Sequence, residues 1–228
     1  MATQSSDVVR PRRALSGVDA IPDGPRRSEP PGGQDVSQRE RSAIEPDAVA
    51  AAIERARRDR SAFAELYDAY FARVYGYVAA RLGSRSDAED VVADTFVRAL
   101  DALPRFEYRG PGSFAAWLFR IAHNRALTES AKHRHQVDLD PDAVAGRPAS
   151  LVDRSPEATL EQAEDAQLIR RLIQSLSPRR QEVVTLRFFG GLRNREIAEV
   201  LGLDERTVAS HLCRALDELR TKYRDAAD

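Results

Sequence analysis

The stretch from Leu176 to Leu219 constrains the fold more than any other part of the sequence. Ser177-Pro178 predicts a helix start, because serine is a favoured N-cap and proline at the first helical position gives up no needed donor. That helix ends at Gly190-Gly191, a short second helix ends at Gly202, and a third begins at Asp204 or Glu205. This order is the outline of a helix-turn-helix, whose last helix enters the major groove of DNA.

The third helix has two chemically different faces at about 100° per residue. Its apolar face, which we expect to be buried, carries Val208, Leu212, Ala215, Leu216 and Leu219. The opposite face carries Arg206, Thr207, Ser210, Cys213 and Arg214, with His211 on the flank. Donors near the start of a last helix are typical of base contacts. The alternative is an ordinary helical hairpin in a larger all-α core, but the glycine turn and the polar face favour DNA binding.

The charge balance limits how such a chain can hold nucleic acid. Lysine and arginine number 35 against 36 acidic residues, a net charge of −1, so DNA binding must come from local patches. The single cysteine, Cys213, excludes an internal disulfide framework. No apolar run resembles a signal peptide or a membrane span. We therefore expect a cytoplasmic protein without membrane insertion.

Two segments precede the central part of the chain. Residues 1–45 contain five prolines and few large apolar residues, so we predict a disordered N-terminal arm. Residues 46–135 show helical periodicity instead. A short helix is expected over 47–58, and a long one begins at Ser61 and stops at Gly83. The apolar positions of the long helix are Phe63, Leu66, Tyr67, Tyr70, Phe71, Val74, Tyr77, Val78 and Leu82.

The next helix is expected to begin with a capping box from Ser86 to Glu89 and to end at Pro104. One side of it is apolar. The other side carries Asp87, Asp90, Asp94 and Arg98. Taken by itself, this charged side is explained by simple solvation.

A turn-rich loop and a cationic helix follow. From Arg105 to His135 there are six lysines and arginines against two glutamates. Phe106, Tyr108 and Trp117 lie close to this charge, and Ser113 is expected to cap the helix. Aromatic rings beside positive charge suit single-stranded DNA, because unstacked bases need a platform and phosphates need cations. A core tryptophan beside a solvated basic helix end explains the same residues equally well.

The linker between the two helical parts is acidic. Residues 136–165 hold eight carboxylates against two arginines, and prolines and a glycine interrupt them. We place a flexible linker at 136–163 and a second helical domain at 164–228. The predicted fold is therefore all-α: two small helical domains joined by a flexible acidic linker, the C-terminal one a helix-turn-helix.

No motif supports an enzyme, a metal or a cofactor. His133 and His135 stand two residues apart and diverge on a helix, unlike the four-residue spacing of helical zinc ligands. The sequence has no glycine-rich phosphate loop, nucleophile elbow or paired carboxylates. We predict a protein with no catalytic residues and no cofactor.

In this order the pieces resemble an RNA polymerase sigma factor of the extracytoplasmic-function (ECF) subfamily of the sigma-70 family. The resemblance covers roughly residues 55–223. It is carried by DAEDVVADTFVRAL (87–100), by FEYRGPGSFAAWLFRIAHNRAL (106–127) and by the helix-turn-helix. The second stretch is similar to the family pattern WLxxIAxN at Trp117, Leu118, Ile121, Ala122 and Asn124.

The resemblance implies a role for each part. Core RNA polymerase would dock on Asp87, Asp90, Asp94 and Arg98. The −10 promoter element would be melted and read by Phe106, Tyr108, Arg109, Trp117, Arg120, Asn124, Arg125 and Lys132. The −35 element would be read as duplex by Arg193, Asn194, Arg206, Thr207, Ser210, His211 and Arg214. The expected partners are core polymerase and promoter DNA, and the family commonly adds an anti-sigma factor.

The competing hypothesis is a conventional helix-turn-helix transcription regulator of the response-regulator type, whose last block also begins LSPR. Such a regulator needs a receiver or sensor domain upstream. Residues 60–135 show all-helical periodicity and lack the alternating strands of a receiver. The sigma factor hypothesis is therefore preferred.

Overall fold

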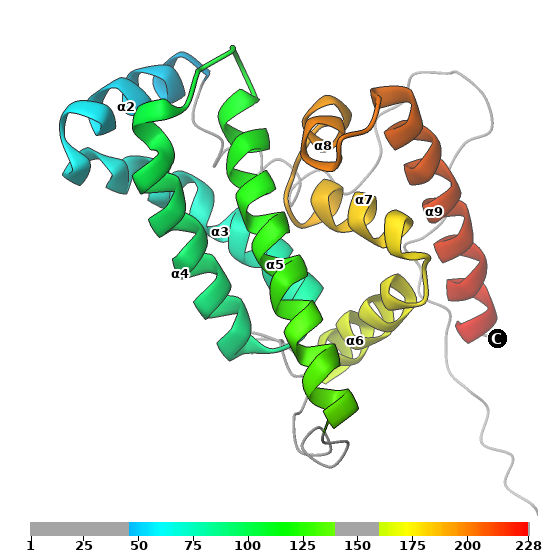
Figure 1. The fold of residues 1–228 in the computed structure, drawn as a ribbon. Coiled ribbons are helices and arrows are strands. Elements are labelled where there is room, and N and C mark those ends of the chain that lie inside the picture. The colour runs from blue at the N-terminus through cyan, green and yellow to red at the C-terminus, as the bar shows by residue number, and fades with distance from the viewer. Residues whose placement is uncertain (1–45, 140–159, 228) are drawn as a thin grey trace, which may run out of the picture.

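The computed structural model describes residues 46–139 and 160–227 (Figure 1). Both ranges are helical and neither contains a strand, so the predicted all-α class is confirmed for the part of the chain described. The predicted N-terminal arm lies outside the described residues. Most of the predicted linker, 140–159, does so too.

The first unit consists of four α-helices and two short 3₁₀ turns. They are α2 (Pro46–Arg58), η1 (Arg60–Ala62), α3 (Phe63–Leu82), α4 (Arg85–Ala102), η2 (Leu103–Arg105) and α5 (Ser113–Leu139). The helices α3, α4 and α5 pack against one another in all three pairs. Their common core contains the fully buried side chains of Leu66, Val74, Val78, Leu118 and Phe119.

The expected helix starts are corrected at two places. Gly83 ends α3 in the left-handed conformation with φ 74°, and the chain turns at once into α4. The N-cap of α4 is therefore Ser84, whose hydroxyl accepts from the Asp87 N–H, and not Ser86. Ser113 does not cap α5 either. Its hydroxyl donates to the Gly110 carbonyl at 2.7 Å, which closes the preceding loop.

Two aromatic residues predicted to be inward on α3 are partly exposed. Tyr67 is 38% and Phe71 37% exposed, and their ring centroids lie 5.1 Å apart. Both rings lie near Phe96 of α4, with centroid distances of 4.7 Å for Tyr67 and 6.5 Å for Phe71. The three- and four-residue spacing therefore predicts a wider buried stripe on α3 than the structure shows.

The second unit contains α6 (Leu160–Gln174), α7 (Pro178–Phe188), α8 (Asn194–Leu201) and α9 (Glu205–Ala227). Ser177 stands at the N-cap of α7 with Pro178 behind it, as predicted. Gly202 makes the turn before the last helix in the left-handed conformation, with φ 65°. The predicted helix-turn-helix order is therefore confirmed. One expected core position of the last helix is wrong, since Leu216 is 38% exposed.

The two units are not separate bodies. In Figure 1, α5 lies between α4 on one side and α7 and α8 on the other, and α5 contacts α8 extensively. Val183, Leu186, Leu192 and Ile197 of the second unit are fully buried in the same apolar cluster as the core of the first. The sequence did not predict this joint core.

Helix α5 continues to Leu139, and α6 begins at Leu160. Among the described residues, no helix is long and apolar enough to cross a membrane. The same residues include no group of three His, Cys, Asp or Glu side chains placed to hold a metal ion.

His123 is the histidine that the described side chains bury between the units, and it makes stability depend on pH. The Tyr77 hydroxyl lies 2.9 Å from His123 Nδ1. Burial lowers the pKa of His123, Glu182 opposes this, and the charges of Arg81 and Arg179 lower the pKa further. The folded state therefore holds a neutral imidazole at a pH where the unfolded chain, with a pKa near 6.5, already binds a proton.

We predict that the free energy of unfolding falls as the pH drops below 6.5, by at most about 1.4 kcal/mol per pH unit for this group. The contribution is fully present above that pH. His123→Gln should remove this part of the slope in urea unfolding measured from pH 5 to 8, and His211→Gln should keep it. An unchanged slope in His123→Gln would contradict the assignment.

Candidate nucleic-acid interface

The loop before α5 and the first turns of α5 bring aromatic rings together. Phe106 and Trp117 have ring centroids 4.6 Å apart, and Phe106 and Phe114 lie 5.7 Å apart. Phe106 is only 8% exposed, whereas Trp117 is half-buried. Phe106 thus packs against the indole of Trp117, and Trp117 is the more accessible of the two rings.

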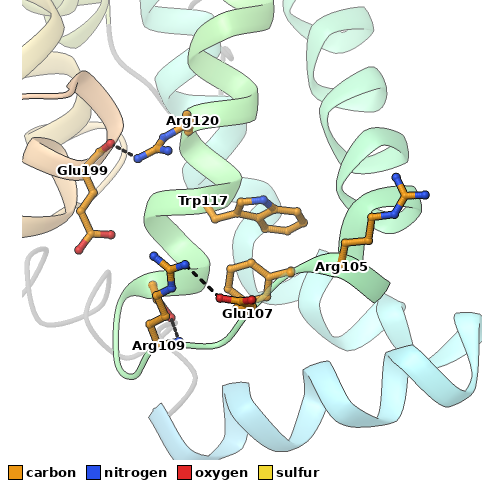
Figure 2. A pocket seen from close by; sticks show the side chains of 8 residues that line it. Arg105, Glu107, Arg109, Trp117, Arg120 and Glu199 are labelled. Atoms are coloured by element: carbon orange, nitrogen blue, oxygen red, sulfur yellow. Dashed lines mark hydrogen bonds and ion pairs between the residues drawn. The ribbon is translucent and has the colours of Figure 1, made fainter.

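Trp117 borders a cavity of about 320 Å³ (Figure 2). The cavity is lined by Arg105, Phe106, Glu107, Arg109, Ser113, Trp117, Arg120 and Glu199. Three of these side chains are arginines, so an aromatic ring and positive charge meet in one place. A stacked base with its phosphates requires this combination.

The basic residues of this unit differ in how they are held. Arg109 pairs with Glu107 at 3.0 Å, and Lys132 pairs with Glu129 at 2.9 Å. Arg120 is exposed, and its guanidinium donates to the Glu199 carbonyl of α8. Asn124 is exposed on the same helix, and Tyr108 is half-buried in the loop.

Arg125 links α5 to the acidic side of α4. Its guanidinium forms an ion pair with Asp94, which also accepts from Arg98 at 2.9 and 3.0 Å. Partial burial acts to raise the pKa of Asp94, but the hydrogen bonds and charges of Arg98 and Arg125 outweigh it, so the pKa lies below its usual value. Asp90 is exposed and Asp87 half-buried at the start of the same helix. Asp94 therefore belongs to both candidate surfaces.

The last helix exposes most of the face predicted to read duplex DNA. Arg206, Ser210 and Arg214 are exposed, and His211 is half-buried. Thr207 forms hydrogen bonds within the first turn of the helix: its N–H and hydroxyl donate to the Asp204 carboxylate at 2.8 and 2.5 Å. These hydrogen bonds, the one from the hydroxyl first, lower the pKa of Asp204 and cap the helix.

Arg193 and Asn194 lie at the start of α8, apart from the α9 face. Arg193 is exposed, and its N–H donates to Glu196 at 2.8 Å. Asn194 is half-buried, and its side-chain oxygen has no hydrogen-bond partner. The sequence analysis missed Arg105 and Glu199 as cavity residues. The basic count beside the loop already included Arg105, but no sequence pattern brings Glu199 to it.

Comparison with known proteins agrees with this geometry. Residues 66–136 match the family model for sigma-70 region 2, and residues 166–219 match that for sigma-70 region 4. The ECF RNA polymerase sigma factor BldN of Streptomyces coelicolor is 36% identical over 177 residues, 77% of this chain and 66% of BldN. RNA polymerase sigma factor YlaC of Bacillus subtilis is 31% identical over 169 residues, 73% of this chain and 96% of YlaC.

Two solved complexes share the fold. CnrH, bound to the cytosolic domain of CnrY, superposes with a TM-score of 0.57 at 24% identity, covering 78% of this chain and 97% of CnrH. RpoE of Bartonella quintana, bound to the anti-sigma factor NepR, gives 0.58 at 22% identity, covering 71% and 96%.

The chain belongs to the sigma-70 family of RNA polymerase sigma factors. Its relatives place it more narrowly in the ECF group. It is a sigma factor that directs promoter recognition, and this family is not one of enzymes.

The shared role of Asp94 predicts unequal effects of two similar substitutions on α4. Asp94→Asn removes the charge that holds both Arg98 and Arg125, and Arg125 is only 24% exposed. We expect a loss of about 1 kcal/mol in unfolding free energy. Glu89→Gln breaks only the exposed pair with Arg85 and should cost about 0.3–0.5 kcal/mol. Equal losses in chemical denaturation would show that the Arg125 pair adds nothing.

Proposed function

We propose that residues 46–135 hold core RNA polymerase and read the −10 element, and that residues 164–228 read the −35 element as duplex. The observation that carries this division is the pairing of two different surfaces in one chain. Trp117 with its arginines suits an opened strand, whereas the donor face of α9 suits a major groove. The protein carries out this role in the cytoplasm.

On the first domain, Trp117 is the stacking platform for an unpaired base of the −10 element. Arg109, Arg120, Asn124, Arg125 and Lys132 contact the strand, and Tyr108 borders it. Phe106 acts through Trp117, because it is buried beneath the indole. Since stacking on an aromatic ring is worth about 1–3 kcal/mol per base, one ring offsets part of the free energy that unpairing a base costs.

On the second domain, Arg206, Ser210, His211 and Arg214 enter the major groove of the −35 element. Thr207 anchors the start of the helix through Asp204 and places these side chains. Arg193 and Asn194 approach the DNA backbone from the start of α8. An arginine that binds guanine in a bidentate manner provides about 1–3 kcal/mol of discrimination.

The acidic side of α4 is the polymerase-binding surface. Asp87, Asp90, Asp94 and Arg98 lie there, and exposed Val97 adds apolar area at 58% exposure. Sigma factors of this fold occur in complexes with anti-sigma factors, as with RpoE and NepR, and we propose that an anti-sigma factor also regulates this chain. The response-regulator alternative is not favoured, because sigma-70 region 2 occupies the place of a receiver domain.

Reconstituted transcription tests the proposed function. The purified chain added to bacterial core polymerase should give promoter-specific transcripts from a genomic library, and transcript ends should reveal both promoter elements. Asp90→Lys combined with Asp87→Lys should weaken binding to core, since both charges are reversed on the docking surface. The absence of any complex with core polymerase would refute the proposal.

Trp117→Ala separates strand reading from duplex binding. Loss of a stacked base predicts a reduction in promoter opening of about thirtyfold, at the middle of the stacking range. Duplex binding to the −35 element should change little, and Trp117→Phe, which keeps an aromatic ring, should retain most opening. The readout is permanganate reactivity of unpaired thymines. Equal losses of opening and duplex binding would make Trp117 a core residue only.

A further inference from the structure

Helix α2 is hydrogen-bonded to the loop before α5 through the side chain of Arg57. Its Nε atom donates to the Leu103 carbonyl at 3.4 Å, and its Nη2 atom donates to the Phe106 carbonyl. Its Nη1 atom donates to Glu54, one turn earlier on α2, at 2.6 Å. In Figure 1, α2 lies beside the end of α4, and it contacts η2, where the chain enters this loop. The partly buried guanidinium of Arg57 therefore joins α2 to the start of the loop.

The two carbonyls lie where the chain leaves α4. The Leu103 carbonyl also accepts from the Phe106 N–H at 3.1 Å, which closes the 3₁₀ turn η2. Phe106 itself is extended, with φ −72° and ψ 130°, so its carbonyl no longer belongs to a helical ladder. The carbonyl of a buried residue in this position needs a donor from elsewhere in the chain, and Arg57 supplies it. A charged donor also makes a stronger hydrogen bond than a neutral one.

The residue held in this way carries the ring that packs on Trp117. The Phe106 ring lies 4.6 Å from the indole at an interplanar angle of 34°, and it meets Phe114 edge-on at 80°. Because the ring and the carbonyl belong to the same residue, a shift of the Phe106 backbone also shifts the ring. Arg57 is thus connected to the indole of Trp117 through Phe106.

The other end of the loop is held separately. The Ser113 hydroxyl donates to the Gly110 carbonyl at 2.7 Å and accepts from the Arg109 N–H at 3.1 Å. These hydrogen bonds join residues within the loop and the first turn of α5. Arg57 therefore anchors the end of the loop next to α4, and Ser113 anchors the end next to α5.

The docking of α2 rests on other side chains. Its apolar face is buried at Val49, Ala52, Ile53 and Ala56. Arg55, two residues before Arg57, is exposed and pairs with Glu65 at 2.7 Å. Arg55 therefore joins α2 to α3, whereas Arg57 joins α2 to the loop. This difference makes Arg55 a matched control for Arg57.

We propose that Arg57 is a positioning residue for reading the −10 strand: its hydrogen bonds to the Leu103 and Phe106 carbonyls fix the Phe106 ring, and thereby the face of Trp117 on which a base stacks. Arg57 acts through the loop and does not contact the strand itself. The inference rests on the proposed role of Trp117 in strand reading. It gives α2 a part in promoter opening.

The first test follows Trp117, the only tryptophan, in the free full-length chain. Arg57→Met keeps the apolar stem and removes the donors. It should increase the quenching of Trp117 emission by acrylamide, because the Phe106 ring no longer has a fixed place beside the indole. Arg55→Met should leave the quenching unchanged. Quenching equal to that of the unsubstituted chain in a folded Arg57→Met would overturn the proposal.

The second test measures promoter opening with core polymerase, by permanganate reactivity. Loss of the charged donor in Arg57→Met predicts a reduction in opening of about tenfold. This is less than the loss expected for Trp117→Ala, because the indole is displaced and not removed. Binding to core polymerase and to the −35 duplex should stay at the level of the unsubstituted chain, which general destabilisation would not allow.

A conservative variant completes the second test. Arg57→Lys keeps the charge and can satisfy one carbonyl, so its opening should lie between those of Arg57→Met and the unsubstituted chain. If Arg57→Met does not fold, Arg57→Lys should still open promoters less well than Arg55→Lys, and equal opening by these two variants would refute the proposal. Equal losses of opening and duplex binding in Arg57→Met would refute it as well.

The two proposals fail in different ways. If the unsubstituted chain opens promoters and Arg57→Met opens them equally well, the positioning role fails and the proposed function stands. If the unsubstituted chain opens no promoter, the proposed function fails, and the quenching of Trp117 still decides whether Arg57 positions the indole.

Discussion

The packing of Phe119 against the turn between α7 and α8 is the contact on which the whole arrangement depends. Phe119 is fully buried, and the turn reaches it only because Gly190 has no side chain. Each unit is a small helical bundle that can bury only a limited apolar core by itself. Burial of apolar surface is the main source of its folding free energy. Joining the two cores therefore adds stability that neither unit supplies alone.

The consequence for function is that α5 has competing uses. One side of the helix meets α4 through Arg125 and Asp94, another packs on α8, and its first turns carry Trp117 and Arg120. Helix α8 therefore contacts the same helix that carries the proposed −10 residues.

Local patterns predicted the helices, the helix-turn-helix and the family. Ser177-Pro178 and Gly202 have strong conformational preferences that act within a few residues. The errors have physical causes. Leu216 was assigned from spacing, whereas its exposure is decided by which helix packs alongside. The cap lies at Ser84 instead of Ser86 because Gly83 ends α3 and the chain turns at once into α4. The hydrogen bond from Arg73 to the Gly190 carbonyl was beyond prediction, since the two residues are 117 positions apart and no periodicity connects them. The polymerase-binding role proposed for the acidic side around Asp94 comes from the family resemblance and from no pattern in the sequence itself.

The most direct test of the shared core is equilibrium unfolding followed by two probes at once. Trp117 is the only tryptophan and reports on the first unit, and a dye on Cys213, the only cysteine, reports on the second. If the cores are joined, both signals change at the same denaturant concentration with the same steepness. Two separate transitions, with the helix-turn-helix melting on its own, would contradict the account.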